Sequence, residues 1–176
     1  MKSRTPLLIA LVAALALFTA GASAQSLTVR HSFQGDDGRY PQAALTLGSD
    51  GYLYGTTTSG GDPAACAAYL SCGTAFRIDL LGNFAALHSF TPAEGGQPGR
   101  LVQASDGNFY GATAAYGSPA PGTNCAFAAG CGTLFRMSPA GEVTVLHDFT
   151  GMAGDGSGSN GGLVQASDGN LYGVMS

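Results

Sequence analysis

The chain has no tryptophan, its only lysine is Lys2, and 7 basic and 11 acidic residues are all the charge among its 176 residues. The formal net charge is −4, and without the first 24 residues five arginines face eleven acids, a net charge of −6. Nucleic acid and anionic membrane surfaces attract cations, which are scarce here. We therefore expect no nucleic-acid partner.

Long apolar runs are also missing, apart from residues 6–20. That run is shorter than the roughly 20 residues that cross a bilayer. Lys2 and Arg4 precede it and Ala22-Ser23-Ala24 follows it, an order typical of a secretory signal peptide. The sequence predicts a signal peptide over residues 1–24, cleavage after Ala24, and a secreted or cell-surface protein with no membrane span once the signal is removed.

No segment after residue 24 has the 3.6-residue apolar period of a helix, and the chain instead repeats itself. Ser-Asp-Gly-Tyr-Leu-Tyr-Gly at residues 49–55 returns as Ser-Asp-Gly-Asn-Phe-Tyr-Gly at 105–111 and Ser-Asp-Gly-Asn-Leu-Tyr-Gly at 167–173. Cys-Gly-Thr-(Ala/Leu)-Phe-Arg begins at Cys72 and at Cys131. Repeats of this length with several short strands are typical of propeller blades and other all-β arrays.

The complete copy predicts four strands, over residues 101–104, 108–113, 132–137 and 142–149. Two-residue hairpin turns with positive φ are expected at the Asp-Gly pairs, since Gly adopts positive φ freely and Asp tolerates it. These pairs are Asp50-Gly51, Asp106-Gly107 and Asp168-Gly169. The predicted fold is all-β, with tandem four-stranded antiparallel repeats that resemble propeller blades, incomplete at about two and a half blades.

The predicted units are an orphan strand at 25–34, repeat 1 at 35–90, repeat 2 at 91–149 and a partial repeat 3 at 150–176. The third copy stops after its second strand, whereas propellers typically close with about four to eight blades. We expect a fragment of a longer protein. An open stack, or several copies associating through open strand edges, is the alternative.

Four cysteines form two pairs with the same spacing, Cys66 with Cys72 and Cys125 with Cys131. Equivalent positions in successive repeats predict one disulfide within each repeat, since export favours oxidation. A four-cysteine zinc site is the less favoured alternative, because paired zinc ligands are usually separated by two to four residues.

Every histidine occupies the same position in a strand that ends in Leu-His-(Ser/Asp)-Phe or its N-terminal counterpart: His31, His88 and His147. At a two-residue period, Val143, Val145, His147 and Phe149 should share one face. A histidine repeated in this way is expected to be structural, with its ring satisfied by backbone or by a turn Asp, rather than to bind metal.

These combined motifs, from residue 27 to residue 175, resemble the bacterial GloVer repeat of the choice-of-anchor tandem repeat GloVer-containing proteins. The resemblance implies an exported, repeat-built surface protein, usually with more copies and often with a C-terminal sorting or anchoring segment. It implies no catalytic residues, so none is assigned to this chain.

Three functions follow as hypotheses, and none requires a cofactor. The first is a non-catalytic binding or structural module whose partner is a glycan or a surface protein, because equivalent loops side by side make an extended surface. The alternative is a fragment of a secreted propeller enzyme acting on polysaccharide. The repeat, however, isolates the only glutamates, Glu94 and Glu142, in unrelated loops. Calcium binding by the loops with Asp36-Asp37-Gly38, Glu94-Gly95 and Asp155-Gly156 ranks below solvated turn acids.

Overall fold

The computed structural model describes residues 27–66, 72–118, 125, 130–152, 154–157 and 162–174, and it confirms the all-β fold. These residues form eleven strands and no helix, so no helix among them could cross a membrane. The predicted signal peptide and its cleavage site lie outside the described residues.

Two antiparallel sheets correspond to the two full repeats. The first has the order β1-β2-β3-β4, from β1 (Thr46–Leu47), β2 (Leu53–Thr57), β3 (Thr74–Ile78) and β4 (Phe84–Ser89). The second contains β6 (Val102–Gln103), β7 (Phe109–Ala115), β8 (Thr133–Met137) and β9 (Val143–Asp148), and β5 (Gly96–Pro98) pairs with the far end of β7. β10 (Val164–Gln165) and β11 (Leu171–Tyr172) form a separate hairpin.

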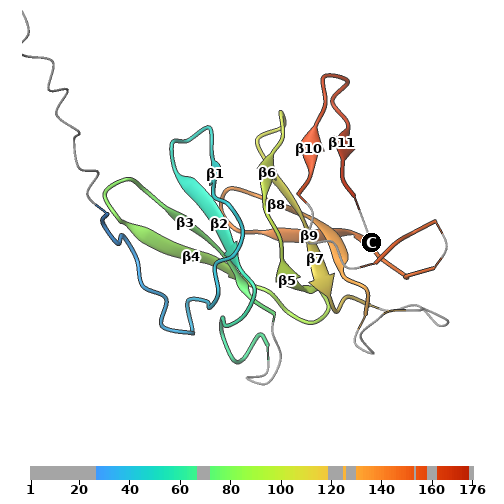
Figure 1. Cartoon of the computed structure of the whole chain (residues 1–176), viewed down its shortest axis with the longest axis horizontal. Coiled ribbons are helices and arrows are strands. Elements are labelled where there is room, and N and C mark those ends of the chain that lie inside the picture. Colours follow the sequence, from blue (N-terminus) through green and yellow to red (C-terminus); the bar gives the residue numbers. More distant parts are fainter. Residues whose placement is uncertain are drawn as a thin grey trace, which may run out of the picture.

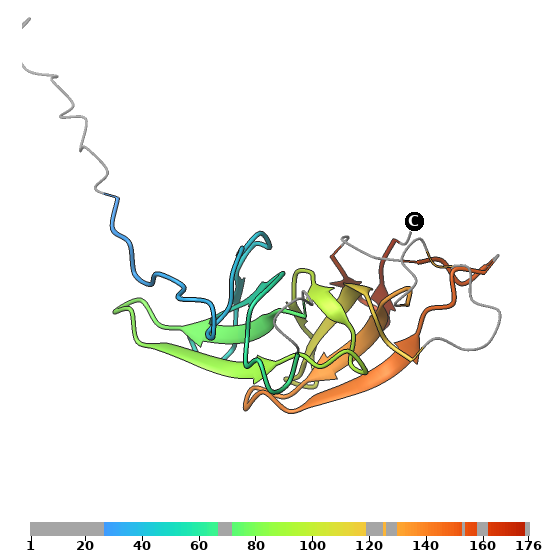
Figure 2. The same ribbon diagram turned by 90° about the horizontal axis from the view of Figure 1, so that it is seen from below.

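The repeats follow one another in space as they do in the sequence. Both views show the first sheet, the second sheet and the β10–β11 hairpin side by side in chain order (Figures 1 and 2). The hairpins β1–β2, β6–β7 and β10–β11 point the same way (Figure 1). The sheets are not closed into a ring.

The hairpin turns differ from the two-residue form predicted at the Asp-Gly pairs. In the second repeat the Gly107 N–H donates to the Ala104 carbonyl, and the Ala104 N–H donates to the Asn108 carbonyl, so the loop has three residues. Gly107 has a φ of 83° and Asp106 is not among the residues with positive φ. Only the glycine takes the left-handed conformation, as in a G1 bulge, because the Asp side chain instead accepts the Asn108 N–H.

The prediction for the face of the histidines was wrong, because a β-bulge precedes them in the strand. β8 and β9 pair Phe135 with Val145 but Leu134 with His147, so Leu146 is an extra residue. The register of β3 with β4 shifts at the equivalent place. One extra residue moves the following side chains to the other face. His147 therefore does not share a face with Val143 and Val145.

The bulge lets β4 and the residue after it contact the elements on both sides of the strand. The first half of β4 places Phe84 against Phe33, with ring centroids 5.6 Å apart. Beyond the bulge, Phe90 packs edge-on against Phe135 of the second sheet at 5.1 Å. Phe33 packs against Phe76 in the same way at 5.2 Å, so the contact recurs from one unit to the next.

The main core lies between the two sheets. Tyr54 of β2 packs on Phe109 of β7 with ring centroids 4.0 Å apart, and both rings are fully buried. The same cluster contains Cys66, Cys72, Ala75, Phe90, Leu101, Phe135 and Met137. Burying one side chain of this kind stabilises a fold by about 1.5–3 kcal/mol, so this interface holds the repeats together.

The orphan strand predicted over residues 25–34 is not formed in its described part, residues 27–34. The segment lies beside the first sheet, and His31 stacks on Phe84 with ring centroids 3.6 Å apart (Figure 1). Its counterparts β4 and β9 each pair with the strand before them, β3 or β8. No described strand precedes the segment and could pair with it in this way, so it packs through its side chains without a ladder.

Candidate functional site

The three histidines each lie against a carboxylate from the turn that follows their strand. The Nε2 atoms of His31, His88 and His147 are 2.8, 3.1 and 2.6 Å from carboxylate oxygens of Asp37, Glu94 and Asp155. The acid follows the histidine by six residues in the first two cases and by eight in the third. A loop of variable length therefore ends in the same histidine–carboxylate hydrogen bond.

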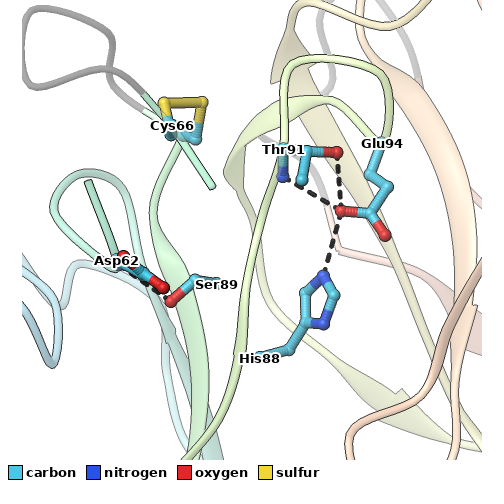
Figure 3. Close-up of a disulfide and its surroundings, with 7 residues drawn as sticks. Asp62, Cys66, His88, Ser89, Thr91 and Glu94 are labelled. Carbon is cyan, nitrogen blue, oxygen red and sulfur yellow. Dashed lines mark hydrogen bonds and ion pairs between the residues drawn. A yellow bond between two sulfur atoms is a disulfide. The ribbon is translucent and has the colours of Figure 1, made fainter. Parts of the chain in front are cut away.

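Each of these carboxylates also caps the start of its own turn. The N–H and the hydroxyl of Thr91 donate to Glu94 Oε2 at 3.0 and 2.9 Å (Figure 3). Burial alone would raise the pKa of Glu94, but the hydrogen bonds from Thr91 and the nearby His88 outweigh it and lower that pKa. The same groups, contributed by Thr150 and His147, lower the pKa of Asp155 to about 2. The carboxylates are therefore held in their charged form.

Buried threonines connect this turn to the next sheet. The hydroxyls of Thr113 in β7 and Thr133 in β8 are 3.1 Å apart, and Thr133 donates to the backbone carbonyl of Glu94 at 2.7 Å. Thr57 and Thr74 repeat this arrangement in the first sheet, where Thr74 donates to the carbonyl of Asp37. We call each set of one histidine, its turn acid and the two threonines a repeat junction.

The residue after the acid must be glycine at the repeat junction. Gly95 has a φ of 98°, and a Cβ there would lie 2.1 Å from Thr113 Oγ1. Gly38 has a φ of 123°, and a Cβ there would lie 2.5 Å from Thr57 Oγ1 and 2.6 Å from Thr74 Oγ1. The sequence indicates only an acidic loop here, and the contact with the threonines appears in the structure alone. The signal for it was a threonine at the same position in both repeated motifs.

The predicted disulfides, Cys66–Cys72 and Cys125–Cys131, are confirmed, and no described cysteine is free. Cys66 and Cys72 are buried in the core between the sheets. Beside this disulfide, the Asp62 N–H donates to the Ser89 hydroxyl at 3.0 Å, so the loop is fixed to the end of β4 (Figure 3). With the thiols oxidised, the four-cysteine zinc hypothesis does not hold.

The Asp of each Ser-Asp-Gly turn is held within its own hairpin. The hydroxyls of Tyr54, Tyr110 and Tyr172 donate to Asp50, Asp106 and Asp168 at 2.7, 2.8 and 2.7 Å. Hydrogen bonds from Asn108 and Tyr110 lower the pKa of Asp106, and those from Asn170 and Tyr172 do the same for Asp168. Gly51, Gly107 and Gly169 have φ values of 85°, 83° and 84° in these turns.

In the second and third hairpins a glutamine, which no sequence motif had indicated, bonds to the turn of the preceding repeat. The Ser49 N–H donates to Gln103 Oε1 at 2.7 Å, and Gln103 Nε2 donates to the Ser49 hydroxyl at 3.2 Å. Gln165 makes the same two bonds to Ser105 at 2.9 and 3.3 Å. Leu47 occupies the equivalent position in the first hairpin.

Carboxylates in the loops considered for calcium are used within the fold. Asp37 accepts the Gln34 N–H as well as bonding to His31. Hydrogen bonds from Gln34 and His31 outweigh the effect of burial and lower its pKa. Among the described residues, no group of three His, Cys, Asp or Glu side chains has the arrangement of a metal site.

A groove lies where the segments that lead into successive repeats meet, with a volume of about 630 Å³. Its lining comes from the loop before β1, the end of β2, β5 with the loop after it, and one residue before β10. These residues are Gln42, Ala43, Ala44, Thr58, Ser59, Gln97, Pro98, Gly99, Arg100 and Gly162. Among the described residues, the lining includes one cation and no carboxylate, a feature that no motif in the sequence had indicated.

Comparison with known proteins agrees with this repeated geometry. No curated protein matches the chain. Residues 16–176 match the family described as the Gloeobacter/Verrucomicrobia repeat, so the match spans both sheets and the β10–β11 hairpin. The chain belongs to the Gloeobacter/Verrucomicrobia repeat family.

Proposed function

We propose that this protein is exported and acts at the cell surface or outside the cell as a non-catalytic binding or structural module. One observation carries the proposal: the polar residues best suited to chemistry make the same structural contacts in successive repeats. His31, His88 and His147 each pair with a turn acid, and the Ser-Asp-Gly acids each accept a tyrosine hydroxyl. A catalytic centre would be expected to depart from such symmetry.

The two disulfides support the location. They close loops of equal length in successive repeats, and such bonds persist in oxidising compartments outside the cytosol. N-terminal sequencing of the exported protein tests this directly. The expected first residue is Gln25, and a mature chain that still began at Met1 would contradict the proposed export.

We further propose that the sheets are successive blades of a propeller-like array. Its support is the equivalence of the packing contacts, in which Phe33 meets Phe76 as Phe90 meets Phe135. Repeating the rotation and translation that relate the first sheet to the second would place further blades beside them. Small-angle scattering of a chain extended by additional repeats should give a closed, disc-shaped particle, and an extended rod would contradict the blade arrangement.

The decisive test of the non-catalytic role is a paired screen for binding and for cleavage with a panel of polysaccharides. We expect binding without turnover, and we expect Glu94→Gln to lower the melting temperature with no activity to lose. Cleavage that disappears in Glu94→Gln, with the melting temperature unchanged, would establish the polysaccharide enzyme instead.

A further inference from the structure

The groove between repeats contains polar side chains that the fold itself does not use. The guanidinium of Arg100 and the side-chain amides of Gln42 and Gln97 line it, and none has a hydrogen-bond partner among the described residues. Arg100 is exposed, and its stem lies 3.7 Å from the position that a Cβ on Gly162 would occupy. These groups contrast with those of the repeat junction, which are all engaged.

On the side of the groove formed by β5 and the residues after β2, the backbone groups, unlike these side chains, already have partners. The Gln97 N–H donates to the Cys72 carbonyl, the Gly99 N–H to Ala112, and the Ser59 N–H to Arg39. Thr56 donates to the carbonyls of Pro98 and Gly99. A peptide that binds by adding a strand needs free backbone groups. On this side the groove therefore offers side chains, and not free backbone groups, to a ligand.

Those side chains define the chemistry of the ligand. A guanidinium binds a carboxylate through paired N–H donors, and the bond is strengthened by charge. Amides and hydroxyls, here those of Gln42, Gln97 and Ser59, can both donate to and accept from the hydroxyls of a sugar. Ala43, which is partly exposed, adds a small apolar surface suited to the C–H face of a sugar ring.

We propose that this groove binds an acidic oligosaccharide, a chain of uronic acid units, with Arg100 contacting a carboxylate and the two glutamines contacting ring hydroxyls. The assignment rests on the proposed binding function and names its site and ligand class. A volume of about 630 Å³ lies within the range of about 300–1,000 Å³ that is usual for ligand sites. With a net charge of −6 after residue 24, the protein repels anions in general, so a specific cation is needed.

Calorimetric titration of the purified chain with trigalacturonate, against maltotriose as the neutral match, tests the proposal. Trigalacturonate should bind at least tenfold more tightly than maltotriose, and its affinity should fall with added salt. Arg100→Gln should weaken trigalacturonate binding by about tenfold or more, since hydrogen bonds to charged groups contribute the most. Arg136→Gln, which removes an exposed arginine on β8 outside the groove, is the matched control and should change nothing.

Gln97 has a φ of 56°, so Gln97→Asn is preferred there because Asn tolerates that conformation. This variant and Gln42→Ala should each weaken binding by a few-fold with an unchanged melting temperature. The proposal is overturned if trigalacturonate does not bind at millimolar concentration, or if maltotriose binds equally well. Equal losses in Arg100→Gln and Arg136→Gln, or equally tight binding of triaspartate, would overturn it as well.

The outcomes separate this proposal from the proposed function. Binding of another glycan or of a protein, unaffected by Arg100→Gln, would refute the groove assignment and leave the binding role intact. Trigalacturonate that binds through Arg100 and is then cleaved would support the groove and refute the non-catalytic role.

Discussion

Replacing Phe90 by alanine should destabilise the protein more than the same change at any equivalent position. Phe90 is fully buried and packs edge-on against Phe135 of the second sheet, 5.1 Å between ring centroids. Truncating a buried phenylalanine costs about 3–5 kcal/mol, including the cavity that remains. Whole domains are stable by only about 5–15 kcal/mol, so this one contact is a large share.

The matched control is Phe149→Ala, at the same position of the next repeat. Phe149 is only partly buried, and the ring contact described for it is with His147 at 5.0 Å. We expect a loss of about 1 kcal/mol there. For a chain of this size, 1 kcal/mol lowers the melting temperature by about 2–4 °C, so a difference of about 2–4 kcal/mol should separate the two variants by roughly 4–16 °C in a thermal unfolding scan.

Equal losses of melting temperature in the two variants would refute this reasoning, because they would mean that Phe90 gains nothing from the second sheet. Phe90→Leu keeps most of the apolar volume and provides a second measurement if the alanine variant does not fold. It should recover more than half of the loss, since a buried leucine fills most of the site.

Three further predictions concern the repeat junction and the turns. Lowering the pH from 5 to 2.5 should decrease the free energy of unfolding, because the pKa of Asp37, Glu94 and Asp155 is lowered in the fold, to about 2 for Asp155, and the unfolded chain takes up protons first. These carboxylates contribute their full share of stability above their unfolded pKa values and lose it as the pH falls through their folded pKa values. Urea midpoints that do not change with pH in this window would contradict the hydrogen bonds that hold the carboxylates charged. Gly95→Ala should destabilise far more than Gly107→Ala: both glycines have positive φ, but only at position 95 does a Cβ meet a threonine, and at position 107 it meets nothing within 4 Å. The Gly107 change should cost about 1–2 kcal/mol, and equal melting temperatures would show that the threonine contact is unimportant. Gln103→Ala should cost about 1–2 kcal/mol through its bonds to Ser49, whereas Leu47→Ala, at the equivalent and exposed position, should change stability by less than about 0.5 kcal/mol; chemical denaturation of both variants measures the difference.

The fold class and the disulfides could be predicted because both depend on local sequence patterns that recur. Asp-Gly turns, short β-rich segments and two equally spaced cysteine pairs each identify the same unit independently of the others. The predicted strand at residues 132–137 and the observed β8, Thr133–Met137, differ by a single residue. A repeat can be predicted from sequence when independent local signals agree in this way.

The face of the histidines could not be predicted, because the bulge that sets it has no signature in the strand itself. Val143, Val145 and His147 alternate as in a regular strand, and only the pairing with β8 shows that Leu146 is extra. The bulge depends on the partner strand, and single-strand periodicity does not contain that information. The same limit applies to β5. Its Gly-Gln-Pro sequence has low strand propensity, and it is a strand because it pairs with β7.

Contacts between repeats could not be predicted from the sequence either. Ser49 and Gln103, for example, are more than 50 residues apart. Nothing in either local motif shows that the Gln of one hairpin bonds to the Ser of the previous one. The groove has the same origin, because it is assembled from loops that precede three different hairpins. Arg100 could be singled out only once those loops were placed together.

The stability of the protein and its proposed ligand site depend on the same interfaces. The first repeat contacts the second through a phenylalanine pair, through a threonine bonded to the backbone carbonyl of the turn acid, and through the glutamine of the hairpin. In repeat proteins, stability is approximately the sum of the units and of such nearest-neighbour interfaces. Gln42, Gln97 and Arg100 come from the segments that enter two successive units, so their spacing is fixed by the interface and not by either unit alone. A ligand that contacts all three residues would therefore bind the docked pair of repeats and stabilise the interface between them.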